Sequence, residues 1–144
     1  MCLQLVDDET TQRLEKSFKK LLSKNGSYAW KILSFNFSTK KWETPYFGDD
    51  IDWGKEQVST RETKELSQEE KSSKQVNLGF HVFCTKASAT KELEIMEQYV
   101  TRKLLLVKVK VNTDDLVAVG YFALGKSNYK SAVFTKIKYV REEA

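Results

Sequence analysis

The stretch at 104–111 reads LLLVKVKV, and its alternation sets the expected class of fold. Aliphatic residues occupy the odd positions from 105 to 111, while Lys108 and Lys110 stand at even positions between them. Because successive side chains of a strand point to opposite faces, this pattern predicts a strand with one buried face and one face toward water. Such one-sided strands are typical of antiparallel sheets.

Two more strands are predicted after this one. The stretch 116–124 is apolar at both parities, and the stretch 133–140 alternates apolar residues with Lys136 and Lys138. Short polar turns connect the three segments. We therefore expect them to pair in order, as an antiparallel meander.

The amino-terminal third predicts a helix followed by a strand. Asp7 and Asp8 are candidates to cap the helix and Asn25-Gly26 supplies a left-handed end, so we expect helix from about 8 to 24. Residues 28–37 are bulky and aromatic at both parities, which is typical of a strand covered on both faces.

The middle of the chain predicts less regular structure. Residues 42–54 mix aromatic residues with Pro45 and glycines, which indicates a packed irregular loop. Nearly all residues from 56 to 75 are polar, and such a segment buries too little surface to offset its ordering entropy. We expect a mobile polar excursion at about 56–75, with a solvated helix at about 62–74 as the alternative.

A strand at 78–85 and a helix at 86–99 complete the pattern. A chain of 144 residues is close to the commonest size of one domain, so we expect a single domain over 1–144. The predicted fold class is α+β, with an antiparallel sheet of about five strands and with two helices.

The charge is only mildly basic overall. Lys and Arg together number 24 against 20 Asp and Glu, which gives a net charge of +4, and the pI is near 8.9. Dedicated nucleic-acid binders are more basic than this. The positive charge is concentrated, however, because 101–140 holds eight basic residues and two aspartates, Asp114 and Asp115.

The two cysteines, Cys2 and Cys84, belong to no CxxC pair and to no Cys/His cluster with metal-ligand spacing. We therefore expect no metal site, and no motif indicates a cofactor. The chain begins without a basic leader and has no apolar run approaching about 18 residues. We expect a cytoplasmic protein with reduced thiols and no membrane association.

Several short motifs stand in a fixed order along the chain. It begins Met-Cys-Leu, has Trp30-Lys31 in an aromatic strand and a Trp-x-x-Pro-Tyr loop from Trp42 to Tyr46, and carries Gly79-Phe80-His81 before a helix. In these features it resembles small uncharacterised phage and bacterial proteins. The resemblance covers most of the chain and implies a phage-related origin, but it brings no function.

The order of elements is also similar to the ADP-ribosyltransferase fold, which has a Ser-Thr-Ser-like motif before a helix and a Glu-x-Glu-like motif at a later strand. Here Phe83-Cys84-Thr85 and Asn128-Tyr129-Lys130 stand at those places. Stabilising a developing cation needs a carboxylate, and Lys130 inverts that charge. The resemblance therefore implies a degenerate transferase in which the activity is absent.

Two residues are candidates for catalysis. His81 is the single histidine and could act as a general base, although a half-buried structural histidine fits the same pattern. Cys84 has the opposite parity, which makes a direct pair with His81 geometrically poor. Removal of Met1 would leave Cys2 as an N-terminal nucleophile, whereas the core-like spacing of the aliphatic residues after it favours a buried thiol.

The candidates for binding are four lysines and an aromatic loop. If strands 104–111 and 133–140 are neighbours, the ammonium groups of the four lysines project from one sheet face, where they could bind phosphates: Lys108, Lys110, Lys136 and Lys138. Alternating lysines can equally be a solvated row that protects a sheet edge. The aromatic residues of the loop are Trp42, Tyr46 and Trp53.

We favour a non-enzymatic binding protein whose aromatic loop and basic sheet face engage a macromolecular partner, either a protein or a nucleic acid. The alternative is a degenerate transferase-like enzyme or nucleotide-binding protein that uses His81 or Trp30-Lys31 in a nucleotide pocket. The sequence leaves the oligomeric state open.

Overall fold

The structure, a computed structural model, describes residues 3–44, 51–122 and 130–140. Its helices and strands are β1 (Leu3–Gln4), α1 (Asp8–Asn25), β2 (Tyr28–Asn36), β3 (Lys41–Glu43), β4 (Glu56–Val58), α2 (Gln68–Ser73), β5 (Gln75–Val76), β6 (Phe80–Phe83), α3 (Lys86–Tyr99), β7 (Leu104–Lys110), the 3-10 helix η1 (Thr113–Asp115), β8 (Leu116–Phe122), β9 (Lys130–Phe134) and β10 (Lys136–Val140).

The ten strands of the described residues join in one sheet with the order β4-β10-β7-β2-β6-β9-β8-β1-β5, and β3 pairs with β2 beside this path. All of these pairs are antiparallel. The central strand β2 pairs with the whole of β7 through its residues from Tyr28 to Ser34, but it meets β6 through the single pair Trp30 and Phe83. The sheet therefore has two halves joined by a short seam.

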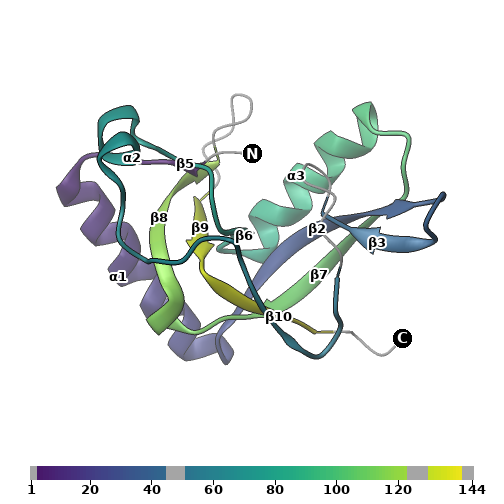
Figure 1. The fold of residues 1–144 in the computed structure, drawn as a ribbon, viewed down its shortest axis with the longest axis horizontal. Helices are drawn as coiled ribbons and strands as arrows, with labels where there is room; N and C mark the ends of the chain where they lie inside the picture. Colours follow the sequence, from purple (N-terminus) through teal and green to yellow (C-terminus); the bar gives the residue numbers. More distant parts are fainter. Residues whose placement is uncertain (1–2, 45–50, 123–129, 141–144) are drawn as a thin grey trace.

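Helix α1 lies mainly against β8 in one half of the sheet, and helix α3 lies mainly against β2 and β7 in the other (Figure 1). Helix α1 contacts β8, and its buried residues Leu14, Phe18 and Leu22 belong to the larger core, where the rings of Phe18 and Phe134 lie 6.1 Å apart. Helix α3 contacts β2 and β7 and packs Ala89 and Met96 into a second cluster. Among the residues that the structure describes, no helix is long and apolar enough to cross a membrane.

The two predicted helices are confirmed. Helix α1 begins after Asp7, whose carboxylate accepts a 2.9 Å hydrogen bond from the Thr10 amide, and it ends at Gly26 in the left-handed conformation with φ of 82°. Helix α3 covers the predicted range, and the Thr85 side chain caps its first turn by accepting from the Ser88 amide.

The prediction of about five strands and two helices is wrong, because the described residues form ten strands and three helices, although the mixture of helix and sheet is retained. Four of the additional strands have only two or three residues, β1, β3, β4 and β5. A segment this short cannot display a two-residue period, so its pairing is decided by neighbours and not by its own pattern.

The predicted meander at 104–140 is wrong in its first step, although its second step is confirmed, because β8 and β9 pair antiparallel. Strands β7 and β8 are consecutive but not paired, since β7 lies between β2 and β10 while β8 lies between β9 and β1. The predicted strand at 133–140 is two strands that separate at Thr135, whose amide donates to the Asp115 carbonyl 2.9 Å away. Strand β9 thus belongs to one half of the sheet and β10 to the other.

The polar segment 56–75 contains β4, α2 and the first residue of β5. Its centre is Arg61, only 6% exposed, whose guanidinium contacts both carboxylate oxygens of Glu70 at 2.7 and 2.9 Å. Arg61 also donates to the carbonyls of Thr63 and Glu65 at 2.7 and 2.9 Å. The alternative of a solvated helix is present in part as α2, which buries no residue. Mobility of the segment stays a prediction.

Candidate functional site

The prediction that four lysines project from one sheet face required strands β7 and β10 to be neighbours, and these two strands are paired. In their register, Lys110 lies directly opposite Lys138 and Lys108 lies opposite Val140, while Lys136 is opposite Val58 of β4. All four lysines have even numbers and so leave the same face of the sheet. We call Lys108, Lys110, Lys136 and Lys138 the lysine face.

The lysine face continues across four strands as a row of directly opposed residues. Tyr28 of β2 is opposite Lys110, Lys110 is opposite Lys138, and Lys138 is opposite Glu56 of β4. The Lys108 ammonium lies 5.2 Å from the centre of the Tyr28 ring, a cation–π contact. The row therefore has an aromatic ring at one end, two ammonium groups in the middle and a carboxylate at the other end.

Helix α3 covers one part of the sheet face that carries the four lysines and leaves the other part open. Ile32 and Leu106, one register pair on the same face, pack under α3 together with Ala89 and Met96. Farther along the same two strands, the register pair Tyr28 and Lys110 lies outside the cluster that α3 covers, and Lys110 is exposed. The lysines thus occupy the uncovered end of the face that carries α3.

Opposed lysines do not stabilise a sheet, because like charges directly across a strand pair repel each other. An acidic neighbour within ion-pair distance would offset that repulsion. Within 3–44, 51–122 and 130–140, the only ion pairs shorter than 4.0 Å are Arg61 with Glu70 and Arg102 with Glu43. The lysine face therefore has no ion-pair partner in the described part of the chain.

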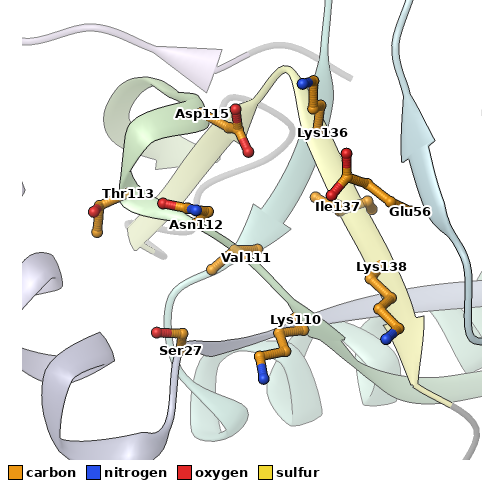
Figure 2. Close-up of a pocket in the computed structure, with 10 residues that line it drawn as sticks. All are labelled: Ser27, Glu56, Lys110, Val111, Asn112, Thr113, Asp115, Lys136, Ile137 and Lys138. Carbon is orange, nitrogen blue, oxygen red and sulfur yellow. The ribbon is translucent and has the colours of Figure 1, made fainter.

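The lysine face borders a hollow of about 370 Å³ (Figure 2). Ammonium, hydroxyl, amide and carboxylate groups all line it, contributed by Ser27, Glu56, Lys110, Val111, Asn112, Thr113, Asp115, Lys136, Ile137 and Lys138. Figure 2 shows the lysines arranged along β7 and β10, with Asn112 and Thr113 on the opposite rim. The hollow therefore combines three ammonium groups with the carboxylates of Glu56 and Asp115.

A second hollow of about 560 Å³ shares Lys110 and Lys138 with the first. Its other lining residues are mainly aromatic or small: Tyr28, Trp53, Gly54, Tyr139 and Val140. The Trp53 ring stands edge-on to the Tyr139 ring at 6.3 Å and is half-buried. One pair of lysines thus separates a polar hollow from an aromatic one.

The turn after α1 positions the aromatic end of the row. Gly26 and Ser27 both have left-handed backbone, with φ of 82° and 70°. The Asn25 side chain donates to the Tyr28 carbonyl at 3.0 Å and accepts from the Tyr28 amide at 3.1 Å. The Ser27 carbonyl accepts from the Val111 amide at 2.9 Å, so the turn is tied to the end of β7. Tyr28 and Ser27 are therefore held at the rim by backbone contacts.

The predicted aromatic loop is not brought together as one site. Trp53 joins Lys110 and Lys138 in the second hollow, whereas Trp42 lies in β3 with its ring 5.2 Å from Phe35. Tyr46 lies outside the described residues, and so does Cys2. The sequence interpretation missed Tyr28 and Glu56, because their place beside the lysines depends on the order of the strands.

His81 is enclosed by backbone. It is 4% exposed, and its ring nitrogens Nε2 and Nδ1 lie 2.9 Å from the Val76 carbonyl and 3.2 Å from the Gly79 carbonyl. Burial lowers the pKa of His81 to about 4, so the ring is neutral near pH 7. A neutral, enclosed ring that bridges β5 and β6 suits the structural interpretation better than a general base.

Of the other residues of the nucleotide-pocket alternative, Lys31 is buried and Trp30 is partly buried. The Lys31 ammonium donates to the His81 carbonyl at 2.7 Å, and burial raises the pKa of the Cys84 thiol to about 12. A thiol with so high a pKa is a poor nucleophile near pH 7. Among the described residues, no three His, Cys, Asp or Glu side chains gather as metal ligands.

Comparisons of the chain with models of known protein families, with curated proteins and with solved structures found no match. The resemblances drawn from short motifs therefore stay predictions, and function is argued from the site alone.

Proposed function

We propose that this is a non-enzymatic binding protein whose lysine face engages a single-stranded nucleic acid. The observation that carries the proposal is the directly opposed pair Lys110 and Lys138, which makes no ion pair shorter than 4.0 Å within the described chain and is bordered by a polar hollow and an aromatic hollow. The proposal keeps the cytoplasmic location and the phage-related origin expected from the sequence.

Phosphate groups are the ligands that this pair of lysines suits. Two ammonium groups on neighbouring strands repel each other, and an anion between them turns that repulsion into two attractions. Lys136, Ser27 and Thr113 line the same hollow and add donors for further phosphate oxygens. A chain of phosphates can thus follow the lysine face.

Single strands are favoured over duplexes because of the aromatic hollow. Tyr28 and Trp53 line it beside the same two lysines. Aromatic side chains bind nucleic acid mainly by stacking on bases, and the faces of bases are accessible only when the bases are unstacked. A phosphate on Lys110 and Lys138 would place its adjacent base near these two rings.

The test measures binding of oligonucleotides of about 15 nucleotides by fluorescence anisotropy over a range of salt concentrations. We expect affinity to fall steeply with salt for the wild type. The double variant Lys110→Gln/Lys138→Gln should bind more weakly, and its slope of log K against log salt should be smaller by about 1.4, or about 0.7 for each lost phosphate contact.

The matched control is Lys19→Gln/Lys20→Gln, which removes the same charge from two exposed lysines of α1. The proposal fails if the wild type shows no salt-sensitive binding, or if both double variants bind alike. Tight binding of a mononucleotide without salt dependence would instead support the nucleotide-binding alternative. A protein partner remains to be sought if no nucleotide or oligonucleotide binds.

A further inference from the structure

We infer that Glu56 and Asp115 make this interface select bases with an exocyclic amino group, cytosine over thymine and uracil. The inference rests on the proposed function, because it needs a nucleic-acid chain on the lysine face. It adds a sequence preference that phosphate contacts alone cannot supply, since phosphates are the same at every nucleotide.

The starting observation is that two carboxylates line an otherwise basic hollow. Glu56 and Asp115 both border it, together with three lysines. Neither carboxylate lies within 4.0 Å of a basic group of the described chain, because the ion pairs found there involve other residues. Figure 2 shows Asp115 and Glu56 on the two sides of β10.

These carboxylates are unfavourable for phosphate binding by itself. A carboxylate beside a phosphate site repels the phosphate, so a surface that served only the backbone would be better without Glu56 and Asp115. An ionised carboxylate accepts hydrogen bonds and donates none. Its place in the hollow therefore suits a ligand group that donates hydrogen bonds next to a phosphate.

Among pyrimidines, that donor distinguishes cytosine. Cytosine carries an amino group at N4 that donates to a carboxylate, whereas thymine and uracil present the O4 acceptor at the same position. A carboxylate facing O4 would meet a second acceptor instead of a donor, so no hydrogen bond could form between them. Because the three bases are of similar size, stacking on Tyr28 or Trp53 should differ little among them.

The strand order sets the geometry of this readout. Glu56, Lys138, Lys110 and Tyr28 occupy one row across four neighbouring strands. With strands about 4.8 Å apart, the row spans about 14 Å. One base can stack at the Tyr28 end and a following base can reach Glu56, with phosphates on the two lysines between them.

The experiment compares oligo-dC, oligo-dT and oligo-dU of about 15 nucleotides, each titrated against the wild type, Glu56→Gln, Asp115→Asn and Glu94→Gln at one salt concentration. Glu94 is the control because it is exposed on α3 and lines neither hollow. We expect the wild type and Glu94→Gln to bind oligo-dC about fivefold more tightly than the other two.

Glu56→Gln or Asp115→Asn should reduce this preference and raise the affinity for oligo-dT, because an amide both donates and accepts and carries no charge. Equal wild-type affinity for the three oligomers overturns the inference and leaves the proposed function intact. A preference that survives both substitutions also overturns it. Absence of binding to all three oligomers overturns the proposed function, and the inference with it.

Discussion

Ser34 and Ser131 are both buried in the sheet, but only the Ser131 hydroxyl has a hydrogen-bond partner among the described residues. The Ser131 hydroxyl donates to the Val82 carbonyl at 2.9 Å. The Ser34 hydroxyl, with its residue 1% exposed, has no hydrogen-bond partner among the described residues. A buried polar group without a partner loses its hydration and gains nothing in return.

The two serines should therefore respond in opposite ways to alanine. Ser34→Ala should raise the free energy of unfolding by up to about 1 kcal/mol, whereas Ser131→Ala should lower it by about 1 kcal/mol. Urea unfolding measures both, with equal m-values as the check that the unfolded state is unchanged. A loss of stability in Ser34→Ala would show that its hydroxyl has a partner in solution.

Lysines of the lysine face should likewise differ from one another in their effect on stability. Lys110→Gln removes the repulsion with Lys138 and leaves Lys138 opposite Glu56, so it should raise the free energy of unfolding by about 0.2–1 kcal/mol, while it weakens binding. Lys108→Gln removes the cation–π contact with Tyr28 and should lower the free energy by about 0.5 kcal/mol. Thermal or urea unfolding in low salt, without nucleic acid, distinguishes the two.

At the scale of elements, the segment from β4 to β5 depends on one ion pair. The hydrogen bonds from Arg61 lower the pKa of the Glu70 carboxyl from its ordinary value of 4.5 to about 2. Glu70 also accepts from the Ser67 amide at the start of α2. One carboxylate thus holds both the helix and the buried guanidinium.

Glu70→Gln should loosen this segment without affecting the central strands. We expect faster amide hydrogen exchange over 59–78 and little change in β7. Glu69→Gln is the matched control, because Glu69 is exposed and makes none of these contacts in the described structure. Rapid exchange over 56–75 already in the wild type would confirm the predicted mobile excursion.

The same ion pair makes a prediction about pH. Because the pKa of Glu70 is lower in the folded state, its stabilisation is complete above about 4.5 and is lost as the pH falls from about 4.5 towards about 2. Glu70→Gln should lack this component of acid destabilisation. Unfolding curves of the two proteins between pH 6 and pH 2 should therefore converge as the pH falls.

The contact between β6 and β9 depends on a glycine. Gly79 has φ of 118°, and a Cβ there would lie 2.5 Å from Cγ1 of Val133, whereas a Cβ on Gly54, with φ of 76°, would meet no atom within 4 Å. Gly79→Ala should therefore lower the free energy of unfolding by about 1–3 kcal/mol more than Gly54→Ala. Similar losses in the two variants would mean that Val133 moves away freely.

At the scale of the whole molecule, binding and stability are linked. A ligand that binds only the folded protein raises its melting temperature, and at a hundredfold excess over Kd it adds about 2.7 kcal/mol. We expect single-stranded oligonucleotides to raise the Tm at low salt and not at high salt. The Lys110→Gln/Lys138→Gln variant should show no such rise, while Lys19→Gln/Lys20→Gln should behave as the wild type.

Local sequence patterns were sufficient to predict the longer helices and strands. Helices α1 and α3 and strand β7 follow from their caps and periodicities, because each is long enough to display a repeat, and β2 follows from its run of bulky residues. The even spacing of the lysines likewise placed them on one face as soon as β7 and β10 were neighbours. These features depend on residues close together in the chain.

The remaining features depend on contacts between distant residues, which no local pattern encodes. The two- and three-residue strands exist only because a neighbour pairs with them, and Thr135 divides a continuous apolar pattern between the two halves of the sheet. Arg61 is buried because the Glu70 carboxylate and three backbone carbonyls accept its hydrogen bonds. Tyr28 and Glu56 join the lysines because the order of the strands puts them in one row, which is a property of the tertiary structure alone.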